Sequence, residues 1–205
     1  MTEKEYVLAF DTANEVIAIG IGLIDSAAKR ISCVASVEVE ARRASNTRLL
    51  ACVDELLANA GVAREGIACV AVGRGPGSFT GVRIAMATAK GVASALEVGL
   101  VGVSTLDAVA WNAQASGVRG RVLVVADAMR KEVYPVEFDL NDAGVTRLGR
   151  DRVVKAGVCA AGYAASVEPR SASGSDASGN LLVTGDALRK YADLFSAAGT
   201  TLDSS

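Results

Sequence analysis

The sequence predicts an α/β fold in which one arrangement of strands and helices occurs twice. An apolar pattern of three strands joined by short turns opens the chain, and a similar pattern returns after Arg121. In both patterns an aspartate turn follows the first strand, at Asp11-Thr12-Ala13 and at Asp127-Ala128-Met129. We therefore expect an internal duplication, although the two copies share little sequence.

Short turns between consecutive strands predict an antiparallel meander at the start of each copy. In the first half, the expected strands are 6–10, 16–24, 31–40, 67–72 and 100–103, and the expected helices are 44–61 and 81–96. In the second half, we expect helices at 104–117 and 187–198 and strands at 121–126, 133–140, 145–150 and 181–184. Residues 169–180 are polar and of low complexity, which predicts a surface loop, and 200–205 are expected to fray. The predicted domains are 1–103 and 104–205.

A glycine-rich corner, Gly73-Arg-Gly-Pro-Gly-Ser-Phe-Thr-Gly81, joins a buried strand to a helix. Glycine permits close backbone approach, and a helix N-terminus after such a corner can bind an anion. The corner lacks the Lys-Ser/Thr of a phosphate loop and misses the dinucleotide fingerprint by one residue. Spacing alone favours a tight corner without a ligand. The candidate nucleotide- or anion-binding residues of the alternative interpretation are Asp11, Thr12, Gly75, Gly77, Ser78 and Thr80.

Composition excludes several classes of function. The 205 residues carry a net charge of −2, which argues against a large basic surface for nucleic acid. The sequence has no histidine, which removes imidazole-based catalysis and every histidine-containing metal site. The four cysteines show no C-x-x-C spacing and lie in apolar contexts, which predicts buried, reduced thiols in a reducing cytoplasm. The charged N-terminus indicates neither a signal peptide nor a membrane span.

The helix expected at 81–96 is more apolar than an ordinary surface helix. Its polar residues fall on one narrow stripe, made of Arg83, Lys90 and Ser94. Small residues recur every four positions at Ala85, Ala89 and Ala93, which permits another helix to approach closely. The helix is therefore either enclosed by its own fold or covered by a partner, and we favour the partner.

Four segments together resemble the TsaB (YeaZ) family: Phe10-Asp-Thr-Ala13, the corner Gly73 to Arg83, Gly102-Val-Ser-Thr-Leu106, and Asp127-Ala-Met-Arg-Lys-Glu-Val-Tyr134. The corner sequence is highly specific to that family, and Val183-Thr-Gly-Asp186 is a weaker match. The resemblance implies an actin/hexokinase/Hsp70-like (ribonuclease H-like) fold of two duplicated α/β lobes, with mixed sheets and helices. The family continues with a further helix and a Pro-x-Tyr-Leu-Arg-like end, so we expect the second lobe to be incomplete at its end.

The resemblance also implies a cytoplasmic accessory role in making threonylcarbamoyladenosine beside the anticodon of tRNA. In the family, this subunit is not the catalyst: it binds the metal-bearing paralogue TsaD, works with the ATPase TsaE, and forms a homodimer when alone. We expect no required cofactor, with ATP or ADP only at the interface of the complex, only indirect contact with tRNA, and no membrane. The catalytic paralogue holds its metal with a histidine-containing helix motif, and the matching region here, 45–50, has no histidine. We therefore expect no catalytic and no metal-binding residues.

In the family, the two helices around the glycine corner form a helical bundle with the partner, which corresponds to 47–60 and 81–96 here. The expected partner-binding residues are Leu50, Val53, Leu57, Val82, Ala85, Met86, Ala89, Val92 and Ala93. An arginine at position 89 is accordingly expected to abolish binding of the paralogue.

Two enzymatic alternatives stay open. A kinase or phosphatase of the same fold would bind phosphate and magnesium at Asp11-Thr12. Such an enzyme also needs a second carboxylate as its base, and Asp127 is a candidate only because of its position at the start of the second lobe. ATP hydrolysis by the isolated protein would support it. An M22-type peptidase, which matches the older glycoprotease label of the family, is least favoured because the sequence has no histidine.

Overall fold

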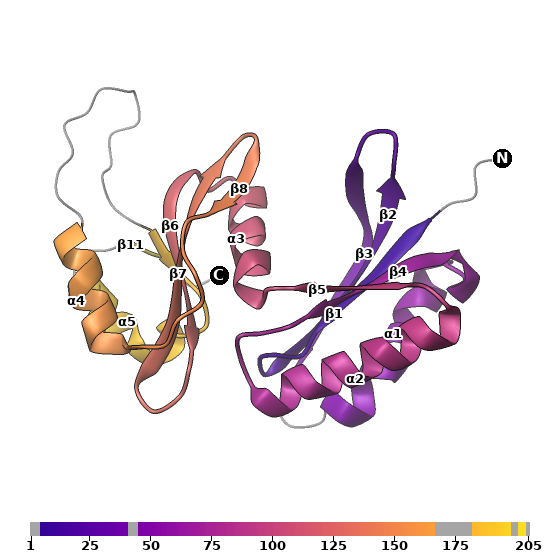
Figure 1. The fold of residues 1–205 in the computed structure, drawn as a ribbon, viewed down its shortest axis with the longest axis horizontal. Coiled ribbons are helices and arrows are strands. Elements are labelled where there is room, and N and C mark those ends of the chain that lie inside the picture. The colour runs from indigo at the N-terminus through magenta and orange to yellow at the C-terminus, as the bar shows by residue number, and fades with distance from the viewer. Residues whose placement is uncertain (1–4, 41–44, 167–181, 198–200, 204–205) are drawn as a thin grey trace. The chain divides into compact units, whose positions relative to one another are not determined.

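The computed structural model describes residues 5–40, 45–166, 182–197 and 201–203. The chain forms two compact units, Met1–Thr105 and Leu106–Ser205, and each is built on one mixed sheet. Figure 1 shows the elements of both units. The loop predicted at 169–180 lies outside the described residues.

Unit 1 has a five-stranded sheet in the order β3-β2-β1-β4-β5. Its strands are β1 (Tyr6–Asp11), β2 (Val16–Asp25), β3 (Arg30–Glu40), β4 (Ile67–Gly73) and β5 (Gly99–Val103). The first three strands form the predicted antiparallel meander, and β4 and β5 run parallel to β1. Helices α1 (Ser45–Ala60) and α2 (Phe79–Leu96) pack on one face, where alternate β2 residues are buried, and the short 3-10 helix Arg64–Gly66 leads into β4.

Unit 2 has a six-stranded sheet with helices on both faces (Figure 1). Its strands are β6 (Gly120–Asp127), β7 (Glu132–Asn141), β8 (Gly144–Arg147), β9 (Val154–Lys155), β10 (Leu182–Thr184) and β11 (Thr201–Asp203). Helix α3 (Thr105–Ala115) covers one face, and α4 (Ala156–Ser166) and α5 (Leu188–Ala197) cover the other. Residues 122–125 of β6 are therefore all fully buried, with successive side chains facing opposite helices.

The two sheets repeat one topology. The main path of the second sheet, β8-β7-β6-β10-β11, matches β3-β2-β1-β4-β5 of the first in order. The strand directions also agree, because β6 and β7 pair antiparallel whereas β6, β10 and β11 run parallel. The structure thus confirms the internal duplication and the predicted α/β fold.

Besides the two-residue strand β9, two elements of unit 2 were absent from the sequence-based expectation. Helix α4 contains Gly157 and Gly162, which weaken a helical pattern, and it is stabilised by burial of Ala156, Cys159 and Ala160 in the core. Within the end that was expected to fray, β11 pairs in parallel with β10. Both elements depend on contacts with distant strands and helices.

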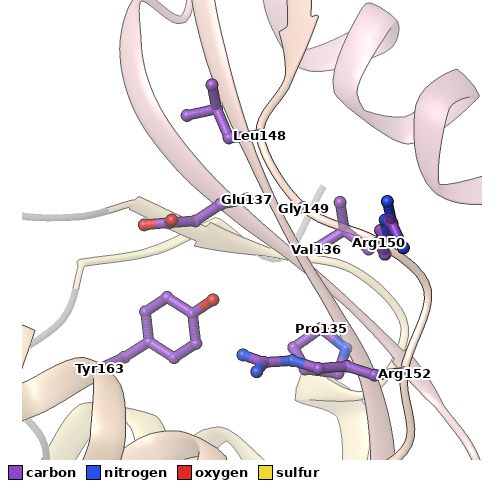
Figure 2. Close-up of a pocket in the computed structure, with 8 residues that line it drawn as sticks. All are labelled: Pro135, Val136, Glu137, Leu148, Gly149, Arg150, Arg152 and Tyr163. Atoms are coloured by element: carbon purple, nitrogen blue, oxygen red, sulfur yellow. The ribbon is translucent and has the colours of Figure 1, made fainter.

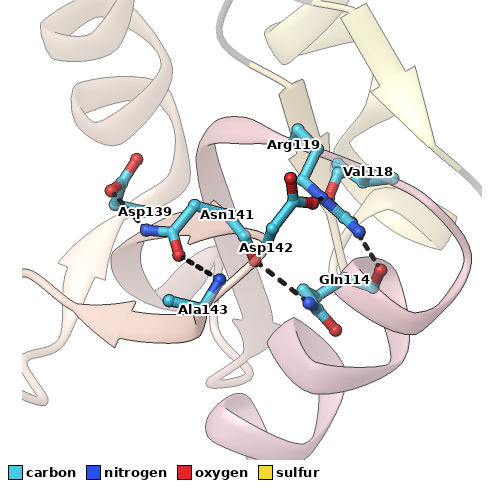
Figure 3. Close-up of polar contacts among 7 residues, drawn as sticks. All are labelled: Gln114, Val118, Arg119, Asp139, Asn141, Asp142 and Ala143. Atoms are coloured by element: carbon cyan, nitrogen blue, oxygen red, sulfur yellow. Dashed lines mark hydrogen bonds and ion pairs between the residues drawn. The ribbon is translucent and has the colours of Figure 1, made fainter.

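The turn between β7 and β8 is tied to the end of α3 (Figure 3). The Gln114 amide donates to the Asn141 carbonyl at 3.0 Å, and Arg119 forms an ion pair with Asp142 at 2.8 Å. The Asn141 side chain accepts from the Ala143 N–H at 2.9 Å, which is the local hydrogen bond expected of an asparagine turn. These contacts are exposed, so they fix the turn geometry more than they stabilise the unit.

All four cysteines are free thiols, but their burial differs from the prediction. Cys159 is buried in the core of unit 2, and Cys52 and Cys69 are half-buried. Cys33 is exposed: it lies on the edge strand β3, and it is not among the β3 residues that pack against the core of unit 1. The expectation of a buried thiol is therefore wrong at Cys33.

In the folded protein, Cys33 is expected to react with an alkylating reagent at least about a hundredfold faster than Cys159 near neutral pH. Burial raises the pKa of Cys159 to about 11, against a smaller opposing effect of Arg152, so little reactive thiolate forms there. Mass spectrometry of the labelled peptides over time measures both rates. In denaturant the two rates should converge, and equal rates in the folded protein would contradict the burial of Cys159.

Candidate functional site

The residues of the candidate anion site meet at one corner of unit 1, where the β1–β2 turn contacts the glycine-rich segment. Asp11 closes β1, and its two carboxylate oxygens accept from the Ala13 N–H and from the Thr105 hydroxyl, each at 2.6 Å. The Thr105 N–H in turn donates to the Gly75 carbonyl at 3.0 Å. Asp11 therefore joins its own turn to Thr105 and, through Thr105, to the glycine corner.

The glycines of the corner are required by the close approach of the β1–β2 turn. The fully buried Thr12 donates its hydroxyl to the Gly81 carbonyl at 2.6 Å, and the Ser78 N–H donates to the Ala13 carbonyl at 2.6 Å. A Cβ at Gly77 would lie 2.5 Å from the Ala13 carbonyl oxygen, and one at Gly81 would overlap the Thr12 carbonyl oxygen. Any larger residue would push the turn away from the corner.

The N-terminus of α2 is capped by the chain itself. Ser78 is the N-cap, and its Oγ accepts from the Gly81 N–H at 3.3 Å. Thr80 lies exposed in the first turn of the helix. Polar groups of Asp11, Thr12, Gly75 and Ser78 thus all hydrogen-bond within unit 1, which supports the interpretation as a tight structural corner. Anion binding by the six candidate residues stays a prediction.

Thr105 was missed by the sequence reasoning as a partner of Asp11, although Ser104-Thr105 was part of the family resemblance. The sequence feature that could have indicated this role is the pair Ser104-Thr105 directly after an apolar strand, and the structure buries both side chains. Sequence spacing could not show the contact, because 94 residues separate Thr105 from Asp11.

Unit 2 repeats the aspartate turn at Asp127, the last residue of β6. The Asp127 Oδ1 accepts from the Met129 N–H at 3.0 Å, just as Asp11 accepts from Ala13. The Asp127 N–H donates to Asp186 Oδ1 at 3.0 Å, and Lys190 forms an ion pair with the Asp127 carboxylate. Burial raises the pKa of Asp186, and the hydrogen bond from the Asp127 N–H opposes this. The hydrogen bond to Asp127 is the main cause that raises the pKa of Lys190.

Several predicted partner-binding side chains face the core of unit 1. On α2, the inner stripe, which we define as Ala85, Ala89 and Ala93, is at most 6% exposed and packs in the core. Val53 and Leu57 of α1 are buried there as well. For these five residues the expectation of partner contact is corrected: the small alanines let α2 lie close to its own sheet. Leu50 is 55% exposed, and Val82, Met86 and Val92 are half-buried.

The solvent side of α2 carries a second row of small residues. This outer stripe consists of Ala87, Gly91 and Ala95, all exposed. A Cβ at Gly91 would meet no described atom within 4 Å, so no contact of the described chain requires glycine there. Phe79, at the start of α2, is 69% exposed, and the Arg83 guanidinium lies 3.9 Å from its ring centroid. Helix α2 therefore presents both a large apolar side chain and a shallow, small-residue surface.

The described residues also bear on membrane and metal functions. No helix among them combines the length and apolarity needed to cross a membrane. The same residues contain no group of three or more His, Cys, Asp or Glu side chains placed to hold a metal ion.

Comparisons with known proteins find the TsaD family model and relatives named TsaB. The family model of TsaD, described as tRNA N6-adenosine threonylcarbamoyltransferase, matches residues 37–195. The tRNA threonylcarbamoyladenosine biosynthesis protein TsaB of Escherichia coli (strain K12) is 35% identical over 142 residues, covering 68% of this chain and 57% of the relative. The protein of the same name from Haemophilus influenzae is 34% identical over 128 residues, covering 62% of this chain and 51% of the relative. The matched part of the chain thus spans little more than half the length of these curated relatives.

Among solved structures, YeaZ from Pseudomonas aeruginosa superposes with a TM-score of 0.72 at 28% identity, covering 98% of this chain and 84% of that one. The fold, the motifs and these matches lead to one conclusion: the chain belongs to the TsaB (YeaZ) family.

Proposed function

We propose that this chain is a non-catalytic scaffold subunit that binds and supports a TsaD-type carbamoyltransferase in threonylcarbamoyladenosine modification of tRNA, together with a TsaE-type ATPase. The names of the relatives supply the process. The observation that carries the scaffold role is the solvent side of α2, with its exposed Phe79 and the outer stripe.

The outer stripe suits a helix–helix contact. Small side chains let two helix backbones approach closely, which increases the number of atoms in van der Waals contact. Glycine in the interior of a helix costs about 1 kcal/mol relative to alanine, so Gly91 is unfavourable for the isolated helix. Phe79 and Leu50 add apolar area, and full burial of such side chains contributes about 1.5–3 kcal/mol each. A partner helix laid along α2 would use all of these features.

The corner geometry supports the scaffold over a kinase-like enzyme. A kinase of this fold would need Asp11 to face phosphate and magnesium, whereas both Asp11 carboxylate oxygens accept hydrogen bonds from Ala13 and Thr105. The peptidase alternative still lacks a histidine for its metal or base. In the proposed role, the reactive groups belong to the partner, and tRNA is contacted through it.

Gly91→Arg is expected to leave the protein folded and to weaken binding of a TsaD-type partner by about thirtyfold or more, the size of an interface hot spot. The new side chain would extend into open space in the monomer but would block a closely packed helix. Co-purification followed by titration calorimetry measures the effect.

The matched control is Gly157→Arg, because Gly157 is an exposed helical glycine of unit 2 with equally open surroundings. It should bind like the wild type. The same surface is proposed for the homodimer, so Gly91→Arg should also lower the solution mass of the protein measured alone. Normal partner binding by a folded Gly91→Arg variant would refute the proposed surface.

A further inference from the structure

The sheet of unit 2 has a gap along one edge of β7. The Leu148 N–H donates to the Glu137 carbonyl at 2.9 Å, and Val154 pairs with Val133. Between these two contacts, residues 149–153 belong to no strand and do not pair with β7. Pro135 lies opposite the gap and has no N–H to donate, which explains how β7 tolerates a proline.

A pocket of about 330 Å³ fills this gap (Figure 2). The apolar part of the lining comes from Pro135 and Leu148, and Tyr163 of α4 forms one wall. Two arginines of the segment 149–153, Arg150 and Arg152, complete the charged part of the lining. In Figure 2, the Tyr163 hydroxyl and the Arg152 guanidinium point into the same space, on the side of β7 that also carries Glu137. The volume lies at the lower end of the range for small-molecule sites, about 300–1,000 Å³.

The pocket carries an excess of positive charge. Glu137 is the one acidic side chain in its lining, and it already accepts from Arg121, which lies outside the lining, at 2.8 Å. Among the described residues, neither Arg150 nor Arg152 has a carboxylate partner within ion-pair distance. Burial is the main cause that raises the pKa of Tyr163, so its phenol stays protonated and can donate a hydrogen bond.

We propose that this pocket, the β7 pocket, binds a nucleotide whose base carries an amino group, either as a free mononucleotide or as an unpaired residue of an RNA strand. A guanidinium matches the geometry of phosphate, which places the phosphate at Arg152. An aromatic ring can stack on a base, which places the base beside Tyr163. A carboxylate accepts from an exocyclic amine, which assigns the base edge to Glu137.

Adenosine monophosphate is the probe, titrated calorimetrically into the full chain beside inorganic phosphate and adenosine. Adenosine monophosphate should bind at least about tenfold more tightly than phosphate, because phosphate alone uses only the cationic side of the pocket. Arg152→Met should weaken its binding by about tenfold or more, and Arg152→Lys should keep part of the affinity. The control Arg119→Met removes an exposed arginine of unit 2 that lies outside the pocket lining, and it should bind like the wild type.

Competition with a single-stranded oligoadenylate separates the two sources of the ligand. Displacement of adenosine monophosphate by the strand at lower concentration would assign the pocket to RNA, and failure to displace it would assign the pocket to the free nucleotide. The proposal is overturned if phosphate binds as tightly as adenosine monophosphate, if Arg152→Met changes nothing, or if no saturable binding occurs at millimolar concentration. The Gly91→Arg variant should still bind the nucleotide, so this proposal can fail or succeed independently of the scaffold function.

Discussion

Gly81→Ala is expected to destabilise unit 1 by about 3 kcal/mol or more, although alanine is the better helix former. The added Cβ would overlap the carbonyl oxygen of Thr12, which is backbone and cannot rotate away. Relief would require the β1–β2 turn to move off the corner. That movement would break the hydrogen bond from the Thr12 hydroxyl to the Gly81 carbonyl and leave polar groups of a fully buried threonine unsatisfied.

The control for this experiment is the same substitution ten residues further along the same helix. Gly91→Ala is expected to stabilise the protein by about 0.5–1 kcal/mol, because the new methyl group meets open space and the unfolded chain loses conformational freedom. Denaturant unfolding followed by circular dichroism measures both variants. The changes in the free energy of unfolding are expected to have opposite signs for the two variants. A stabilising effect of Gly81→Ala would show that the β1–β2 turn does not closely approach the glycine corner.

The duplicated architecture could be predicted from the sequence because its signals are local. Apolar runs, short turns and the repeated aspartate turn indicated two meanders, and the structure pairs the strands in that way. Helix α4 could not be predicted in the same manner. Its glycines and alanines carry little helical periodicity, and burial against distant strands stabilises it.

The orientation of α2 could not be predicted from the sequence either, for a different reason. The inner and outer stripes have the same period of four and nearly the same composition, so either could face the core. Packing against the sheet selects the inner stripe, and that choice depends on strands that lie elsewhere in the chain. The β7 pocket could not be predicted from the sequence, because its lining comes from three separate segments around Pro135, Arg150 and Tyr163.

Ala89→Arg is expected to prevent folding of unit 1 and not merely to abolish partner binding. Ala89 is fully buried in the core, so an arginine there must either bury an unpaired charge or lift α2 off the sheet. An unpaired buried charge costs several kcal/mol, against a total stability of about 5–15 kcal/mol for a typical domain. Loss of the cooperative thermal transition, measured by circular dichroism on the purified variant, is the expected result.

Gly91→Arg is the control for Ala89→Arg, because it introduces the same side chain two residues away on the opposite face of α2. Its thermal transition should be close to that of the wild type, since a side chain at this position extends into open space. If Ala89→Arg folded normally and lost only its partner, the inner stripe would be the docking surface and α2 would be rotated about its axis. The two arginine variants therefore test the orientation of α2 before any partner is added.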